Sequence, residues 1–173
     1  MSWSLLSLAF VAFVFGSGYD AALRTVRKVM RSLPFDPEAL MWAFWVHLYP
    51  DGPAEAFRYL NQSARSAIPT YLQSLNQAAC GMALMFKGDF DAAENYLLRS
   101  LEIAPDGNAT IQLLSSVYVQ AGELGKADAM KDRLLALFQD QTLWRMMWRP
   151  DQQYPPGIVA FYDGLRAAGL AER

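Results

Sequence analysis

The sequence has few residues that form disulfides or metal sites, with one cysteine, Cys80, and one histidine, His47, among 173 residues. A lone cysteine cannot form an intramolecular disulfide, and with one histidine it cannot make a usual zinc ligand set. An excess of one charge is also absent, because 15 basic and 17 acidic residues give a net charge of −2. We therefore expect no nucleic-acid partner, and we take the cytosol as the default compartment.

Motifs of known catalytic chemistry are also missing. The sequence has no phosphate-binding loop, dinucleotide-binding glycine pattern, nucleophile elbow or metalloprotease helix, and Gly16-Ser17-Gly18 matches none of them. His47 has no nucleophile or acid placed for it by the pattern, so we interpret it as a packed or solvated side chain. We interpret Cys80 as a small buried thiol. The sequence therefore predicts no enzyme, and so no catalytic residue, metal or cofactor.

Apolar residues are abundant, at 53% of the chain with 13% aromatic, which is enough for a sizeable core in one domain spanning residues 1–173. The run Leu5–Phe15 is almost wholly apolar and has no basic residue before it. It is shorter than the roughly 20 residues of a spanning helix and meets glycine, so we predict a buried core helix. Membrane association or targeting through residues 1–16 is the alternative.

Alanines that follow turn residues recur along the chain. Ala22, Ala56, Ala93 and Ala127 lie 34, 37 and 34 residues apart, and each closes a short segment that contains glycine or aspartate. This spacing is typical of a repeated two-helix unit, in which small residues stand where the helices approach each other.

The pattern resembles the tetratricopeptide repeat (TPR) family, which places an apolar residue, Leu-Gly, Tyr, Ala, an aromatic and Pro at set positions of each unit. The third unit matches at Gly81, Leu84, Gly88, Ala93, Leu97 and Pro105. The fourth matches at Leu114, Ser115, Tyr118, Gly122, Ala127 and Leu134, although Lys131 replaces the usual aromatic. The first two units match less completely.

The resemblance implies an all-α fold, a right-handed superhelical array of antiparallel helical hairpins (TPR-like, α-solenoid). The expected hairpins cover about residues 3–36, 37–70, 74–107 and 108–140, followed by a C-terminal cap over 141–173.

Local residue choices agree with helical hairpins. Pro34, Pro50 and Pro105 fall at predicted helix ends. Gly88 and Gly122 suit left-handed backbone after a first helix, and Asp89 and Asp106 offer side-chain oxygens to the helix starts that follow. One apolar stripe, interpreted as core, has helical spacing and contains Ala93, Leu97, Leu98 and Leu101.

The resemblance also implies a binding groove lined by the first helix of each hairpin. The family's groove positions correspond to Met41, Trp45, Leu48 and Tyr49 in the second unit, to Ala78, Met82, Met85 and Phe86 in the third, and to Gln112, Ser116 and Gln120 in the fourth. Met and aromatic side chains suit an apolar helix or extended segment of a protein partner. For each of these apolar positions, ordinary core between repeats is the competing interpretation.

Both ends of the sequence carry apolar residues that need covering. Trp144 and Trp148, spaced i, i+4, belong either to the cap or to a docking site on the same or another molecule. The first predicted helix is apolar on nearly every side, so we expect it to pack on a preceding domain, a second copy or a membrane. Phe10, Phe13, Trp144 and Trp148 are therefore our candidates for self-association, and a homo-oligomer is one expected outcome.

The C-terminal segment 161–170, Phe-Tyr-Asp-Gly-Leu-Arg-Ala-Ala-Gly-Leu, resembles the tails of TPR regions behind bacterial class III adenylate cyclase domains or winged-helix regulators, with Ala167 in place of the Lys. Neither of those domains has a counterpart in the sequence. We therefore predict a protein-interaction scaffold or adaptor, as a regulatory module of a larger signalling protein. A membrane-tethered assembly factor and a small secretion-type chaperone are the alternatives.

Overall fold

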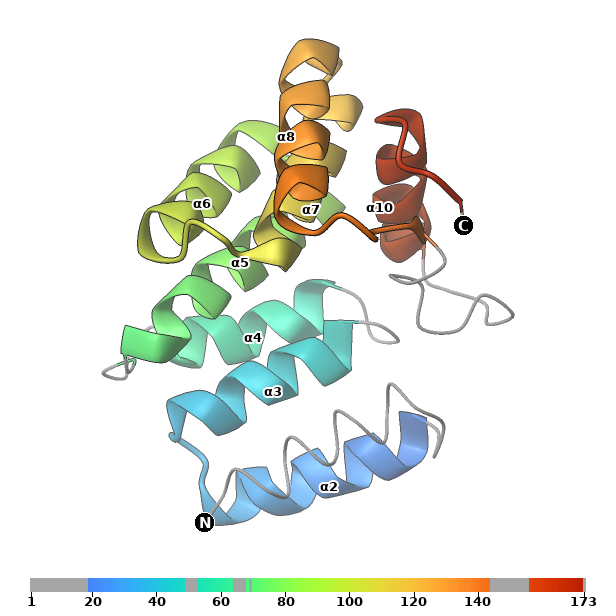
Figure 1. Cartoon of the computed structure of the whole chain (residues 1–173). Helices are drawn as coiled ribbons and strands as arrows, with labels where there is room; N and C mark the ends of the chain where they lie inside the picture. The colour runs from blue at the N-terminus through green and yellow to red at the C-terminus, as the bar shows by residue number, and fades with distance from the viewer. Residues whose placement is uncertain (1–18, 49–52, 64–67, 69, 144–155, 173) are drawn as a thin grey trace. The chain divides into compact units, whose positions relative to one another are not determined.

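The computed structural model describes residues 19–48, 53–63, 68, 70–143 and 156–172, and within these ranges the secondary structure is entirely helical (Figure 1). The all-α class predicted from the sequence is therefore confirmed. The chain divides into two compact units, Met1–Leu72 and Gln73–Arg173, and the boundary falls inside helix α5. The single-domain organisation with its hairpin boundaries stays a prediction.

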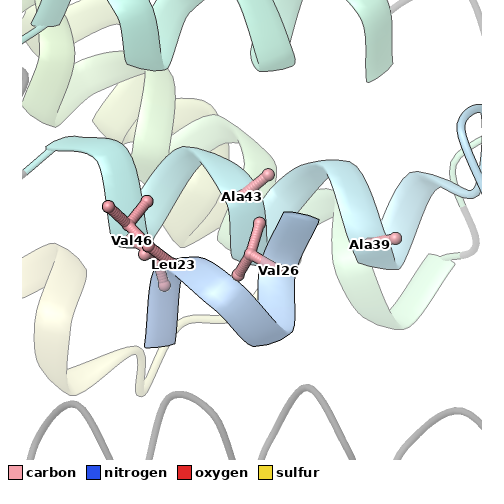
Figure 2. Packing of buried hydrophobic residues seen from close by; sticks show 5 residues of the cluster. All are labelled: Leu23, Val26, Ala39, Ala43 and Val46. Atoms are coloured by element: carbon pink, nitrogen blue, oxygen red, sulfur yellow. The ribbon is translucent and has the colours of Figure 1, made fainter. Parts of the chain in front are cut away.

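The first unit contains helices α2 (Tyr19–Ser32), α3 (Pro37–Leu48) and α4 (Pro53–Ser63), and α3 contacts both of the others. Between α2 and α3, Figure 2 shows the buried side chains of Leu23, Val26, Ala39, Ala43 and Val46. Two of these five residues are alanines of α3, which lets the two helix backbones approach closely. The start of α3 is fixed by Asp36, whose carboxylate accepts a 2.8 Å hydrogen bond from the Ala39 amide.

The second unit contains most of α5 (Thr70–Phe86), with α6 (Phe90–Ile103), α7 (Asn108–Gln120), α8 (Leu124–Leu137) and α10 (Pro156–Ala167). Helix α7 is central, because α6, α8 and α10 all contact it (Figure 1). Its residues Ile111 and Leu114 are fully buried. A buried hydroxyl network joins α5, α6 and α7, in which Ser100 Oγ lies 3.0 Å from Ser74 Oγ and 2.9 Å from Thr110 Oγ1.

The turns that follow α5 and α7 have the left-handed backbone that the sequence predicts for them. Gly88 and Gly122 have φ values of +78° and +80°, the left-handed region that other residues avoid. After α7, the Glu123 amide donates to the Tyr118 carbonyl at 2.7 Å, which closes the helix end. Pro34 and Pro105 each lie two residues beyond a helix end, as expected, while Pro50 lies outside the described residues.

One predicted helix cap is confirmed and the other is wrong. Asp89 caps α6, because its carboxylate accepts a 3.3 Å hydrogen bond from the Ala92 amide. At α7 the capping position is occupied by Gly107, with no side-chain hydrogen bond, so Asp106 does not cap this helix. Asp106 stands one residue too early, because an N-cap side chain reaches only the amides two and three residues ahead.

The predicted apolar stripe of α6 is core except at Leu98. Ala93, Leu97 and Leu101 are buried, but Leu98 is 41% exposed, so its assignment to the core is wrong. Adjacent helix positions differ by about 100°, so Leu97 and Leu98 cannot share one narrow face. Leu97 packs against α5 at Gly81, where a Cβ atom would lie 2.5 Å from Leu97 Cγ. The small residue that the repeat pattern places at Gly81 therefore allows α5 and α6 to pack closely.

Candidate protein-binding surface

The predicted groove residues of α3 differ in exposure. Met41 and Leu48 are buried and belong to the helix packing of the first unit. Trp45 is partly exposed, and its ring meets Phe44 edge-on at a centroid distance of 5.3 Å. Tyr49 lies outside the described residues. Trp45 is therefore the one described α3 candidate that offers side-chain surface to a partner.

The candidates on α5 are mostly core. Ala78, Met82 and Met85 are buried in this structure, so they expose little surface for a partner to contact. Phe86, the last residue of α5, remains partly exposed. The competing interpretation, in which these apolar positions are packing residues, fits the burial of the first three.

The candidates on α7 form local polar contacts. Ser116 is fully buried, whereas Gln112 and Gln120 are partly exposed. The Gln112 side-chain amide donates to Asn108 Oδ1 one turn earlier, and that of Gln120 donates to Ser116 Oγ at 3.0 Å. Both amides are thereby held along the helix surface.

Helix α10 covers part of the predicted groove. A Cβ atom built on Gly157 would lie 2.7 Å from Cγ of the Phe86 ring, and one built on Gly164 would lie 3.0 Å from the Cα of Ser116. Two glycines of α10 therefore pack directly on two groove candidates, one from α5 and one from α7. This contact of α10 was not predicted from the sequence. The sequence feature that indicates it is the seven-residue spacing of Gly157 and Gly164, which puts both glycines on one helix face.

The apolar residues of α10 complete this packing. Ile158, Phe161 and Leu165 are buried, whereas Asp163 and Arg166 are exposed and form an ion pair at 2.6 Å. Helix α10 is thus amphipathic, with its apolar and glycine positions directed into the second unit.

A polar cluster joins α6, α7 and α8. The Tyr118 hydroxyl donates to Glu94 Oε1 at 2.9 Å, and Lys126 Nζ contacts the same oxygen at 3.1 Å while lying 5.0 Å from the Tyr118 ring centroid. Burial, and then the hydrogen bond to Glu94, raise the pKa of Tyr118 to about 12. Hydrogen bonds to Glu123 and Glu94 raise the pKa of Lys126. Tyr118 is therefore neutral and Lys126 charged at physiological pH.

Cys80 and His47, the side chains best suited to act as a nucleophile or a general base, both pack against neighbouring side chains. Cys80 is half-buried, its thiol lies 3.9 Å from Asn76 Oδ1, and burial raises its pKa to about 11, which makes it a poor nucleophile at neutral pH. His47 is buried and stacks on Tyr59 at a centroid distance of 4.9 Å, with 3.2 Å between its Nε2 and the Tyr59 hydroxyl. Among the described residues, no group of three or more His, Cys, Asp and Glu side chains could hold a metal ion.

The four self-association candidates, Phe10, Phe13, Trp144 and Trp148, lie outside the described residues, as does the apolar segment 1–16. The described helices include none that is both long and apolar enough to span a membrane. Self-association and membrane association stay predictions.

Comparison with curated proteins gives one partial likeness. No protein-family model matches the chain. The chain is similar to cellulose synthase operon protein C of Pseudomonas fluorescens (strain SBW25), with 28% identity over 122 residues, which cover 68% of this chain and 10% of that protein. The matching region is therefore a small part of a much longer relative.

Solved structures resemble most of the chain. PilW, described as a widely conserved type IV pilus biogenesis factor, gives a TM-score of 0.69 at 21% identity, covering 94% of this chain and 71% of that one. A thermophilic TPR protein of Thermus thermophilus gives 0.65 at 22% identity, covering 97% and 90%. A chain of the APC/C hetero-tetramer gives 0.72 at 15% identity, covering 95% and 29%. These likenesses confirm the predicted TPR-like, α-solenoid fold.

Proposed function

We propose that this chain is a protein-interaction scaffold that binds an apolar helix or extended segment of a partner protein along the first helices of its hairpins. The observation that carries the proposal is the docking of α10. Its glycines lie against Phe86 and Ser116, two of the residues that the repeat pattern assigns to the groove. This surface therefore accommodates a helix at backbone distance, and a partner helix would bind there in place of α10.

The chemistry of the partner follows from the exposed groove candidates of each unit. In the first unit Trp45 offers an aromatic ring on α3, and in the second unit Gln112 and Gln120 offer amides on α7. A partner segment with an apolar face and small residues matches these groups, because rings bury large apolar areas and small residues allow close backbone approach. No charge on the partner is required at these positions.

The role as a regulatory module of a larger signalling protein is part of the proposal. It is supported by the tail resemblance over residues 161–170, and this segment includes much of the helix that docks on α7. A partner that competes with α10 for Ser116 would connect binding to the position of this tail. Such competition would be a direct physical route to regulation.

Site-specific photo-crosslinking in the native host cells tests the scaffold function. Trp45 and Gln112 are replaced one at a time by p-benzoylphenylalanine, and adducts formed on irradiation are identified by mass spectrometry. We expect each position to give a discrete adduct with an apolar segment of a partner protein. Arg99, exposed on α6, is the control position and should give no such adduct.

Two results would contradict the proposal. One is the absence of a discrete adduct at both Trp45 and Gln112 when the full-length protein is produced at its native level. The other is the same set of adducts at Arg99, which would indicate contact without a preferred surface. Circular dichroism of each purified variant shows whether the substituted chain is still helical.

A further inference from the structure

Helix α2 carries a stripe of four cations. Arg24, Arg27, Lys28 and Arg31 follow the spacing i, i+3, i+4 and i+7, and all four side chains are exposed. Residues at this spacing lie on one helix face. None of the four forms an ion pair with any residue whose side chain the structure describes.

Several cations of the second unit have a carboxylate, backbone or aromatic partner. Lys126, Lys131 and Arg166 form ion pairs with carboxylates. Arg133 donates to the Pro105 carbonyl at 2.7 Å, and Arg99 lies 5.9 Å from the Tyr96 ring centroid. The stripe on α2 is therefore a local concentration of positive charge in a chain of net charge −2.

An open cavity of about 350 Å³ adjoins this stripe, between α2 and α4. Val26, Met30 and Tyr59 supply an apolar lining, and Arg27 and Arg31 line it as well. The volume is within the range of about 300–1,000 Å³ that ligand pockets have. The cavity thus combines space for an apolar side chain with two guanidinium groups.

The lining is held in place by the core. Met30 and Tyr59 pack against the buried cluster of α2 and α3 shown in Figure 2. Tyr59 is also fixed by His47, which stacks on its ring and lies 3.2 Å from its hydroxyl. The buried His47 is therefore a positioning residue for this cavity. A preformed cavity costs less ordering on binding than one that must be assembled.

We propose that the α2–α4 surface is a second docking site, which binds an acidic segment of a partner protein that carries one large apolar side chain. The carboxylates of the segment pair with the stripe, and Arg27 and Arg31 offer the planar fork that binds a carboxylate bidentately. The apolar side chain enters the cavity against Met30 and Tyr59. This site uses the second helices of the hairpins, so it is separate from the first-helix surface proposed above.

The cavity favours a protein segment over a lipid surface as the occupant. The headgroups of an anionic lipid surface would pair with the stripe, but the acyl chains lie beneath them and do not project into a cavity on the protein. An acidic peptide with an apolar anchor uses both features at once.

Fluorescence anisotropy on the full-length chain tests this site. The probe is a short fluorescein-labelled helical peptide with four glutamates at i, i+3, i+4, i+7 spacing and one phenylalanine beside them. We expect binding that weakens as salt is added and that is lost when glutamine replaces the glutamates. The double substitution Arg27→Gln with Arg31→Gln should weaken binding about tenfold, because two exposed ion pairs with the peptide are lost.

Matched variants distinguish the contribution of the arginines to binding from the contribution of the cavity. Lys87→Gln with Arg99→Gln makes the same change in net charge elsewhere on the chain and should leave the dissociation constant unchanged. Met30→Trp fills the cavity and should reduce binding to the level of a peptide with alanine in place of phenylalanine. The substituted arginines are exposed, so circular dichroism should show an intact helical fold.

Three results would overturn the proposal: no binding of the acidic peptide, equal binding to the Arg27/Arg31 variant, or equal binding of the glutamine peptide. A fourth is specific for lipid. Binding to vesicles of phosphatidylcholine and phosphatidylserine that depends on Arg27 and Arg31, without binding of the peptide, would assign the stripe to a membrane surface. Crosslinking at Trp45 is independent of all four results, so the two proposals succeed or fail separately.

Discussion

Gly164 of α10 lies in backbone contact with Ser116 of α7, because a Cβ atom on the glycine would come 3.0 Å from the serine Cα. We expect Gly164→Ala to destabilise the protein. Overpacking costs about 1–3 kcal/mol, and the cost here should lie in the upper part of that range because the added Cβ meets backbone as well as side chain. It then exceeds the roughly 1 kcal/mol that alanine gains over glycine in a helix. Urea unfolding followed by circular dichroism measures the change.

The matched control is Gly125→Ala in α8. A Cβ atom at Gly125 meets no atom within 4 Å, so alanine should be neutral or stabilise by up to about 1 kcal/mol. If Gly164→Ala were as stable as Gly125→Ala, the close packing of α10 on α7 would be contradicted.

Leu97 and Leu98 of α6 should respond very differently to truncation. Leu97 is fully buried against Gly81, so Leu97→Ala should lower the free energy of unfolding by about 2–5 kcal/mol. Leu98 is 41% exposed, so Leu98→Ala should change it by no more than about 0.5 kcal/mol. Equal losses in the two variants, measured by denaturant titration, would restore the single apolar stripe predicted from the sequence.

The two aspartates predicted as helix caps provide another paired test. Asp89→Ala removes the hydrogen bond to the Ala92 amide and should cost about 0.5–1 kcal/mol, the lower part of the usual range because the bond is exposed and 3.3 Å long. Asp106→Ala removes no cap from α7 and should stay within about 0.5 kcal/mol. Thermal unfolding of both variants and the native protein measures the two changes in stability. A larger loss of stability for Asp106→Ala than for Asp89→Ala would contradict the assigned capping residue.

We expect Tyr118 to lose its proton at a higher pH than an ordinary tyrosine. Its pKa is raised from 10.0 to about 12 by burial and by the hydrogen bond to Glu94, so the neutral phenol is the form that the fold favours. The stability that Tyr118 contributes is therefore fully present below about pH 10 and is lost as the pH rises towards about 12. The difference in phenolate absorbance between the native protein and Tyr118→Phe gives its midpoint.

Glu94→Gln tests the cause of this shift. Glutamine can still accept a hydrogen bond but carries no negative charge, so the midpoint of Tyr118 should move down from about 12 towards 10.0. An unchanged midpoint would leave burial as the whole cause. A native midpoint at the unshifted value would contradict the contact itself.

Much of the fold could be predicted because its determinants are local. The alanine spacing gives the repeat length, and Gly88 and Gly122 mark turns that require positive φ. Gly81 marks the close approach of α5 and α6, which follows from the absence of a side chain. Each of these inferences needs only the residue type and its position in the repeat.

The candidate surfaces could be predicted only in part, because exposure depends on neighbours far along the chain. The repeat pattern names Met82 and Phe86 alike as groove residues, but the first is buried and the second is partly exposed beneath Gly157 of α10. The stripe on α2 is visible in the sequence as a spacing. Its cavity is not, because Tyr59 comes from another helix.

The sequence by itself determined the all-α repeat fold, the turns and the small residues at the contact of α5 with α6. Only the tertiary structure decided that α10 packs on α7, that Leu98 faces solvent, and that His47 supports Tyr59 beside the arginines of α2. The physical reason is the same in each case. Helix periodicity specifies which residues share a face, but the packing of distant segments decides which face is covered.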